Sequence, residues 1–213
     1  MKRLLSYLWP FTKEVQSAIN GTLELTLMNG KKVLDSQNAN YSYGTLQRLL
    51  CYGLSKLQIN ETSEILVLGL GGGSIIKSLR NTFNHKGKIT AVEIDQVIID
   101  IAKNEFGISS IPNLEIICDD AFSFINNCDK EFEIVIVDIF IDDEVPEQFY
   151  SIAFWKKTSS IIKSGGSMVF NAGINLKNHD KINHIKSSVG TTMQFDQYDH
   201  VQRVNTLLVG NKI

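Results

Sequence analysis

The chain has 213 residues, with 21 basic and 23 acidic side chains and a formal net charge of −2. Hydrophobic residues make up 43% and charged residues 21%, which is typical of a folded globular protein and not of a disordered, fibrous or membrane-spanning one. This near-neutral charge offers no overall attraction for nucleic acid or anionic lipid, so we expect neither as a partner. The start lacks a leader's cleavage site, and the three cysteines lack metal-ligand spacing, so we expect a cytoplasmic protein.

The amino-terminal part is predicted to be a small β-meander. Three short alternating runs, "KEVQSA", "TLELTLM" and "KKVLDS", are separated by Asn20-Gly21 and Asn29-Gly30. Asn-Gly is the favoured hairpin turn, so these runs should pair as antiparallel strands. We place this region at residues 1–43 and a larger domain at 44–213, which begins with helical spacing in "YSYGTLQRLLCYGLSKL". We also expect the opening "MKRLLSYLWPF" to pack against the body of the protein.

The larger domain is predicted to be a Rossmann-like α/β fold. From Glu64 onward, five short apolar runs alternate with four runs of helical spacing. Runs of Val, Ile and Leu without alternation are typical of strands covered by helices on both faces, so the sheet should be parallel and doubly wound. A further helix near Leu176 to Ser188 precedes "TTMQFDQYD" and "VQRVNTLLVG", whose short link joins antiparallel neighbours. The sheet is thus expected to be mostly parallel and to end in an antiparallel strand pair.

A glycine-rich turn follows the first strand of this domain. The segment "GLGGGS" places Gly69, Gly71 and Gly73 between a strand and a helix, which is the context of a nucleotide-binding turn. Glycine lets the backbone bend sharply and lets a ligand lie against bare main chain. The alternative is a tight strand-to-helix turn that binds nothing.

Glu93 ends the second strand at about the spacing, roughly 20 residues, at which an acid accepts both hydroxyls of a ribose. The alternative is an ordinary solvated carboxylate at a strand end. The turn and this acid together fit a nicotinamide dinucleotide as well as an adenosyl sulfonium, so charge has to decide between the two ligands.

Acidic residues gather where the strands end. In open α/β sheets ligands lie outside the carboxyl ends of the strands, and these ends carry Glu93, Asp95, Asp119, Asp120, Asp138, Asp142, Asp143 and Glu144, with no Lys or Arg among them. Such an edge repels a pyrophosphate and favours a cation. S-adenosylmethionine or its decarboxylated form is therefore favoured over NAD, although the acids could instead solvate loops and cap helices. The four scattered histidines predict no metal site.

Several segments together resemble a known family. "ILVLGLGGGS", "AVEID", "CDDAFSFI", "IVIVDIF" and "SGGSMVFN" are similar, in this order, to the class I S-adenosylmethionine-dependent transferases, and within them to the spermidine synthase-like branch. The meander followed by "NANYSYGTLQRLL" resembles the amino-terminal hairpin region of that branch. The likeness covers nearly the whole chain, and it implies the class I methyltransferase fold and a possible homodimer.

The resemblance also implies roles for single residues. Gly69, Gly71 and Gly73 would line the methionine-like tail, and Glu93 would take the ribose. Adenine would lie against Asp119, Asp120 and Ala121, with Asp120 accepting from its amino group. Asp138 would orient or deprotonate the attacking amine, which is chemically sound because the transfer needs a neutral nitrogen.

The chain departs from the family pattern where the polyamine binds. Gly72 stands where spermidine synthases place an Asp in the glycine turn, and Asp142 comes one position later than their second acid. Tyr43 is kept but is followed by Gly44, and the acidic pair before it is missing. Tyr43 and Asp142 remain candidate substrate residues.

We therefore expect a transferase that moves a methyl or aminopropyl group from an adenosyl sulfonium to a small molecule, an amine in particular. The alternative is a catalytically inactive module that binds an adenosyl nucleoside and has lost its acceptor site. The missing acid at Gly72 favours the second hypothesis.

Overall fold

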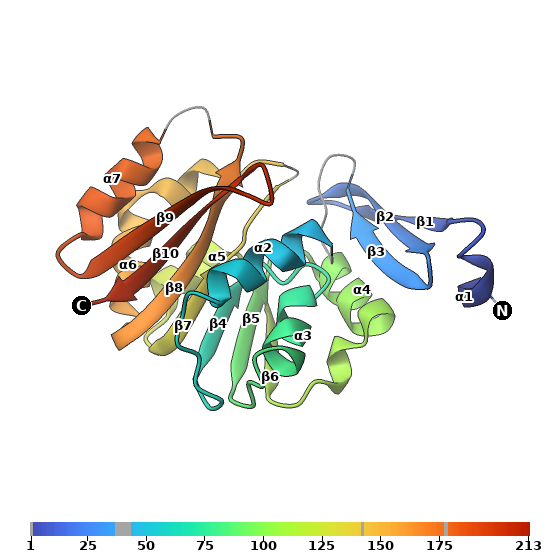
Figure 1. Cartoon of the computed structure of the whole chain (residues 1–213), viewed down its shortest axis with the longest axis horizontal. Coiled ribbons are helices and arrows are strands. Elements are labelled where there is room, and N and C mark those ends of the chain that lie inside the picture. The colour runs from blue at the N-terminus through green and yellow to red at the C-terminus, as the bar shows by residue number, and fades with distance from the viewer. Residues whose placement is uncertain (1, 37–43, 142, 177–178) are drawn as a thin grey trace.

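A computed structural model describes residues 2–36, 44–141, 143–176 and 179–213. Two sheets organise the chain (Figure 1). A three-stranded antiparallel sheet has the order β1-β2-β3, and a seven-stranded sheet has the order β6-β5-β4-β7-β8-β10-β9. The predicted meander and the predicted doubly wound sheet are therefore both confirmed.

The small sheet consists of β1 (Phe11–Ser17), β2 (Gly21–Met28) and β3 (Lys31–Asp35), and a short helix, α1 (Lys2–Leu5), precedes it. Asn29 and Gly30 both have positive φ, 51° and 72°, as a tight Asn-Gly turn requires. The other predicted turn differs, because Ser17 pairs with Gly21 and three residues connect β1 to β2. Only Gly21 of that Asn-Gly pair has positive φ.

The large sheet begins after α2 (Thr45–Leu54). Five parallel strands alternate with four helices: β4 (Ile65–Leu68), α3 (Ser74–Asn81), β5 (Ile89–Glu93), α4 (Gln96–Phe106), β6 (Leu114–Cys118), α5 (Ala121–Asn127), β7 (Phe132–Val137), α6 (Ile152–Ser160) and β8 (Ile162–Ile174). Short 3₁₀ turns cover Ile108–Ser110 and Glu147–Tyr150. The order of strands reverses at β4, and this is where open α/β sheets bind ligands.

The carboxyl-terminal part adds α7 (Asp180–Val189), β9 (Met193–Val201) and β10 (Asn205–Lys212). The last strand, β10, lies antiparallel to both β8 and β9, so it inserts between them. The expected antiparallel pair is present, and its insertion brings β10 directly beside β8.

Helices cover both faces of the large sheet. Leu66 and Leu68 of β4 pack with α5, α6 and α7, whereas Ile65 and Val67 of the same strand pack with α2, α3 and α4. A strand with apolar partners on both sides reads as an uninterrupted apolar run, which is why "ILVL" does not alternate. Figure 1 shows α2 and α3 in front of the sheet, with α5 and α6 behind it.

The small sheet packs on α4. Leu23, Leu25 and Leu34 form a separate apolar cluster with Ile98 and Phe106 and their neighbour Ile101. Polar contacts reinforce this packing, because Ser17 and Asn20 donate hydrogen bonds to the buried carboxylate of Asp95, the N-cap of α4. The meander is thereby held next to the second strand of the large sheet.

One smaller expectation was wrong. The opening segment does not bury its apolar side chains, since Leu4, Leu8 and Trp9 are 76%, 85% and 72% exposed. It contacts the turn between β2 and β3, where the Ser6 hydroxyl accepts a hydrogen bond from the Gly30 backbone and the Tyr7 ring lies against Gly30. The three cysteines are free thiols, of which Cys128 is buried and Cys118 is exposed at the end of β6. Among the described residues, no helix is long and apolar enough to cross a membrane.

Candidate functional site

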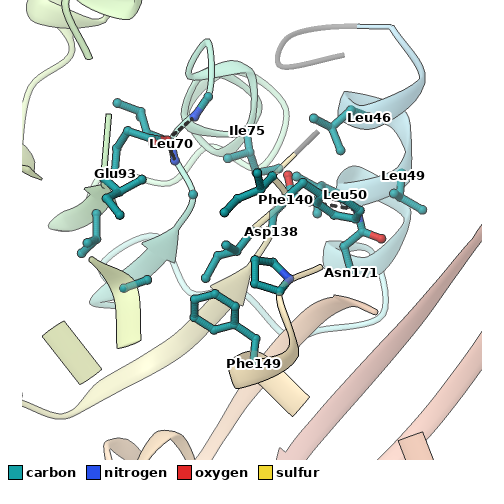
Figure 2. A pocket seen from close by; sticks show the side chains of 18 of the residues that line it. Leu46, Leu49, Leu50, Leu70, Ile75, Glu93, Asp138, Phe140, Phe149 and Asn171 are labelled. Carbon is teal, nitrogen blue, oxygen red and sulfur yellow. Dashed lines mark hydrogen bonds between the residues drawn. The ribbon is translucent and has the colours of Figure 1, made fainter. Parts of the chain in front are cut away.

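A cavity of about 270 Å³ opens at the carboxyl ends of the parallel strands. Its lining comes from the ends of β4, β5, β7 and β8, from the first two turns of α2, from the first turns of α3 and α5, from the segment after β7, from the start of β10 and from Asn20 in the β1–β2 turn. Figure 2 shows Glu93 on one side of this space, the α2 leucines on the other, and Asp138 between them. The predicted cofactor side and the predicted catalytic acid thus open into one cavity.

The glycine turn borders the cavity through Gly69 and Gly71. Gly69 has φ +90°, and a Cβ at this position would lie 2.0 Å from the backbone oxygen of Asp138, so only glycine fits. Gly71 also has positive φ, 51°. Gly73 acts differently, because it starts α3 with φ +73°, and a Cβ there would meet the Ile108 side chain at 2.6 Å. It is not among the lining residues described.

Glu93 is 8% exposed and binds the backbone of the glycine turn through its carboxylate. Its Oε2 accepts hydrogen bonds from the backbone N–H groups of Leu70 (3.1 Å) and Gly71 (3.2 Å), and Oε1 accepts one from Asp95 N–H (3.1 Å). Burial raises the pKa of Glu93, and these three bonds act against that rise. The carboxylate is therefore fixed in place at the cavity surface, with lone pairs for further donors.

The third strand end contributes Asp120 and Ala121, which both line the cavity. Asp120 is the N-cap of α5, where its Oδ1 accepts from Ser123 N–H at 2.8 Å. Asp119 is exposed, and its Oδ1 accepts the Asp120 N–H at 2.8 Å. Of the three predicted adenine residues, the structure brings two into the described lining and leaves Asp119 beside them.

Asp138 follows the last residue of β7 and faces the middle of the cavity (Figure 2). Its Oδ1 accepts a hydrogen bond from Asn171 Nδ2 at 2.9 Å. Burial raises the pKa of Asp138 to about 6, and the Asn171 bond opposes that rise. A carboxylate with this pKa is mostly ionised at neutral pH and is a stronger base than an ordinary Asp, which suits proton abstraction.

Two asparagines that sequence reasoning missed support this acid. Asn171 of β8 is fully buried, and its Oδ1 accepts a hydrogen bond from Asn205 Nδ2 of β10 at 3.1 Å. Both asparagines line the cavity. The available signal was a single amide inside the apolar run "SMVFNAG", because a buried polar group in such a strand needs a specific partner.

The predicted acidic edge divides into acids that face the cavity and acids that do not. The described lining contains Glu93, Asp120 and Asp138, and no Lys, Arg or His. Asp95 is instead turned toward the small sheet, and Asp143 and Glu144 are exposed and are not among the described lining residues. Tyr43 and Asp142 lie outside the described residues. This set of groups favours a cation over an anion.

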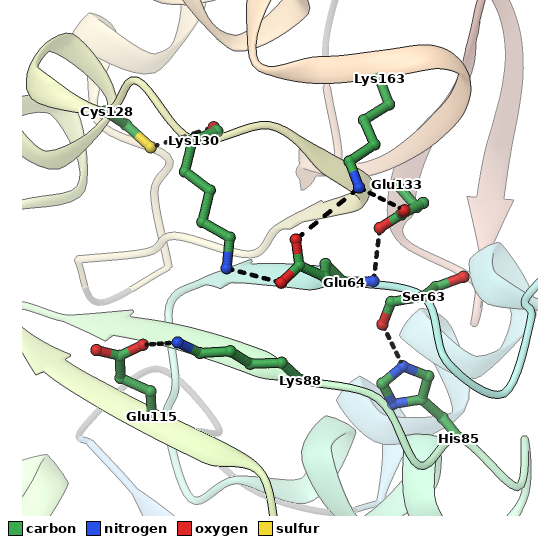
Figure 3. Close-up of polar contacts among 9 residues, drawn as sticks. All are labelled: Ser63, Glu64, His85, Lys88, Glu115, Cys128, Lys130, Glu133 and Lys163. Carbon is green, nitrogen blue, oxygen red and sulfur yellow. Dashed lines mark hydrogen bonds and ion pairs between the residues drawn. The ribbon is translucent and has the colours of Figure 1, made fainter.

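Ion pairs occupy the opposite edge of the sheet, at the amino ends of the strands (Figure 3). Glu64 lies between Lys130 and Lys163, at N···O distances of 2.9 and 3.9 Å, and Lys163 also pairs with Glu133 at 2.6 Å. These side chains are between a third and two fifths exposed, so each pair adds little stability by itself. Their place far from the cavity indicates a structural role. Among the described residues no group of His, Cys, Asp and Glu is arranged to hold a metal ion.

Comparison with known proteins gives a family for the chain. The sequence profile described as "Spermine/spermidine synthase domain" matches residues 49–209. A polyamine aminopropyltransferase of Thermoplasma volcanium is 28% identical over 160 residues, which cover 73% of this chain and 53% of that protein. One of Sulfurisphaera tokodaii is 31% identical over 118 residues, covering 51% of this chain and 38% of that protein. The chain thus spans about half the length, or less, of these curated relatives.

Solved structures show the same fold. A spermidine synthase in complex with the transition-state analogue AdoDATO has a TM-score of 0.67 at 14% identity, covering 94% of this chain and 73% of that one. A probable spermidine synthase from Corynebacterium glutamicum has a TM-score of 0.63 at 17% identity, covering 96% and 77%. Human methyltransferase-like protein 13, in complex with SAH, has a TM-score of 0.62 at 20% identity, covering 78% and 82%. With the profile match over most of the larger domain, the chain belongs to the spermine/spermidine synthase family.

Proposed function

We propose that the protein is an adenosyl-sulfonium-dependent transferase that moves a methyl or aminopropyl group to a small amine, with Asp138 as the base. One observation carries the proposal: a carboxylate with a raised pKa, about 6, opens into the same cavity as a glycine turn held by a buried acid, Glu93. The first feature suits deprotonation of an amine, and the second suits a nucleoside.

The cavity fits the adenosyl group on its Glu93 side. Gly69 and Gly71 expose bare main chain, and Glu93 offers fixed anionic acceptors suited to ribose hydroxyls. Asp120 and Ala121 lie at the next strand end, where we assign the adenine. Three carboxylates without a described basic neighbour would favour a positive sulfur. Two related folds were solved with SAH and with AdoDATO, which supports this assignment.

Asp138 would act on the acceptor. A bound sulfonium supplies an electrophilic carbon: the amine nitrogen forms a bond to it, the carbon–sulfur bond breaks, and the electron pair stays on sulfur in a neutral thioether. Asp138 takes the proton that the nitrogen loses, and Asn171 holds the carboxylate in position while it does so. Alignment of the two substrates in one cavity supplies the rest of the rate enhancement.

A second candidate is a module that binds the nucleoside without turnover. It is favoured by Gly72, which stands in the glycine turn where the resemblance to spermidine synthases implies an acid. This candidate keeps the Glu93 side of the cavity and gives Asp138 no chemical role.

Calorimetry and a turnover assay separate the two. We expect S-adenosylmethionine or its decarboxylated form to bind, and a thioether nucleoside to be released in the presence of amines. Asp138→Asn should lower turnover by about 100-fold or more and leave nucleoside binding unchanged. Asp143→Asn removes an exposed acid five residues away and should change neither. Binding without product for any amine would support the inactive module, and loss of nucleoside binding in Asp138→Asn would contradict a role restricted to the base.

A further inference from the structure

The segment that contains α1 exposes large apolar side chains next to basic ones. The exposed apolar residues are Leu4, Leu5, Tyr7, Leu8, Trp9 and Phe11. Lys2 and Arg3 are exposed beside them, and the sequence carries no acidic residue before Glu14. We name these two basic and six apolar residues the α1 patch. Figure 1 shows α1 at one end of the long axis of the molecule, beyond the small sheet and opposite the end that carries β9.

Hydrogen bonds hold this segment on the small sheet. The Ser6 carbonyl accepts from Asn29 N–H at 2.9 Å, and the Ser6 hydroxyl accepts from Gly30 N–H at 2.9 Å. Within the segment, Trp9 N–H donates to the Leu5 carbonyl at 3.1 Å. Ser6 is buried by these contacts, whereas its apolar neighbours face solvent. The patch is therefore displayed on a hydrogen-bonded turn that is fixed to the β2–β3 connection.

The residue types of the α1 patch suit the surface of a bilayer. Leucine side chains gain from burial at the boundary between headgroups and acyl chains, and tryptophan and tyrosine rings are enriched at that level. Each Lys or Arg near an anionic surface strengthens binding by about five-fold. The net charge of −2, which predicts no attraction for anionic lipid, is a sum over the whole chain and does not describe this local surface.

A second copy of the chain fits the α1 patch less well. In a two-fold dimer the same surface lies on both sides of the interface, so two patches that each carry Lys2 and Arg3 would be brought together. Like charges oppose that approach, whereas anionic headgroups neutralise them. A bilayer also accepts a protruding turn without the matching concave surface that a protein partner has to supply.

We propose that the α1 patch docks the protein on an anionic phospholipid bilayer. Leu4, Leu8 and Trp9, the most exposed apolar side chains of the patch, enter the interface, and Lys2 and Arg3 lie among the headgroups. No residue of the patch belongs to the described lining of the cavity, so the inference does not depend on the proposed function.

Vesicle binding tests this with the unaltered chain. Co-sedimentation compares vesicles of phosphatidylcholine alone with vesicles that contain about one third phosphatidylserine. We expect at least ten-fold tighter binding to the second kind, and a blue shift of Trp9 emission on binding. The other tryptophan, Trp155, is 0% exposed, so its emission should stay the same. Equal binding to both kinds of vesicle overturns the inference, and so does binding to neither.

Substitutions at exposed positions locate the contact without disturbing the core. Leu8→Ser should weaken binding to the phosphatidylserine vesicles by at least five-fold, and Ile213→Ser, at a similarly exposed apolar residue, should not. The double variant Lys2→Gln with Arg3→Gln should weaken it by at least ten-fold. Its control, Lys103→Gln with Lys156→Gln, removes two exposed charges from α4 and α6.

Equal losses in the patch variants and their controls would overturn the inference. Light scattering covers the alternative occupant of the patch. A dimer that Leu8→Ser converts to a monomer, in a protein that binds no vesicles, would assign the α1 patch to contact between copies and would also overturn the inference.

Discussion

The amide of Asn171 donates a hydrogen bond to Asp138 Oδ1 over 2.9 Å, and the two residues follow the paired residues Phe170 and Val137 of neighbouring parallel strands. Strand register thus brings the amide to the acid. A donor stabilises the ionised carboxylate, so this bond keeps the pKa of Asp138 from rising beyond about 6. Asn205 in turn orients the Asn171 amide.

Asn171→Leu should therefore shift the pH dependence of the reaction. Without the amide the pKa of Asp138 rises further, so the acid limb of the kcat/KM profile moves to higher pH. Activity should fall most at neutral pH and recover at alkaline pH, a pattern that loss of packing alone does not produce. Asn211→Leu, at the other end of the sheet, serves as the control. An acid limb at unchanged pH would show that Asn171 does not act through Asp138.

Asp138 should cost the protein stability at neutral pH. Its folded pKa, about 6, lies above the ordinary value of 3.8, so the folded state binds more protons between these values. The protonated carboxyl group therefore stabilises the folded state, fully below pH 3.8, and this stabilisation is lost as pH rises through about 6. Asp138→Asn should then raise the free energy of unfolding at pH 7.5, by up to about 3 kcal/mol, with little change at pH 4. Urea unfolding at both pH values measures this, and an equal effect at both would contradict it.

Glu93→Ala should weaken nucleoside binding by about 2 to 3 kcal/mol, because ribose hydroxyls would lose a charged acceptor and the glycine turn would lose its support. Glu93→Gln keeps one carbonyl acceptor for the turn, so it should bind more tightly than the alanine variant. Calorimetry with S-adenosylmethionine measures both. Glu115→Gln, a strand acid paired with Lys88 outside the lining, should bind as the unaltered chain does. Unchanged affinity in Glu93→Ala would place the ribose elsewhere.

Gly69→Ala should disrupt the cavity edge more than its backbone angle alone explains. Gly69 and Gly165 both have positive φ, 90° and 72°, so alanine strains both. At Gly165 a Cβ meets nothing within 4 Å, whereas at Gly69 it overlaps the Asp138 carbonyl. Gly69→Ala should thus cost about 1 to 3 kcal/mol more than Gly165→Ala in urea unfolding. If the two variants lost the same free energy of unfolding, the ends of β4 and β7 would be able to move apart without cost, contrary to this prediction.

His85 should make the fold sensitive to acid. It is 1% exposed, its Nδ1 accepts from Arg80, and its Nε2 therefore donates to the Ser63 carbonyl (Figure 3). Burial is the main cause that lowers the pKa of His85, and Arg80 lowers it further. The unfolded state thus binds more protons as pH falls below 6.5, and stability falls with it.

Urea unfolding between pH 8 and pH 5 checks this in an Asp138→Asn background, which removes the opposing contribution of that acid. His85→Leu in the same background should flatten the decline. If the free energy of unfolding fell by the same amount with and without His85, the acid sensitivity would be due to other groups.

Much of the cofactor side was predictable from the sequence because it depends on local pattern. Parallel strands share one carboxyl edge, so residues that end successive strands must meet there, and Gly69, Glu93, Asp120 and Asp138 do. The parallel, doubly wound arrangement of the sheet is confirmed, because it too follows from the pattern of each strand and helix. The individual roles of these residues remain predictions.

The acceptor side was not predictable, since it depends on packing between distant segments. Asn205 reaches Asn171 only because β10 inserts beside β8, a placement that two adjacent extended runs do not reveal. The helical spacing of α2 predicts an apolar face but not that Leu46 and Leu49 border a cavity. The position of Asn20 at the cavity was not predictable either, because it depends on how the small sheet packs on α4.

Asp95 connects the meander to the large domain through one carboxylate. It caps α4, accepts from Ser17 and Asn20, and gives its own N–H to Glu93. A nucleoside that settles against Glu93 and Asn20 would then hold the meander and the large domain together, and attachment of the meander would in return strengthen the grip on the nucleoside. Protection of residues 11–35 from protease should accordingly rise with nucleoside concentration, which makes the meander a reporter of occupancy.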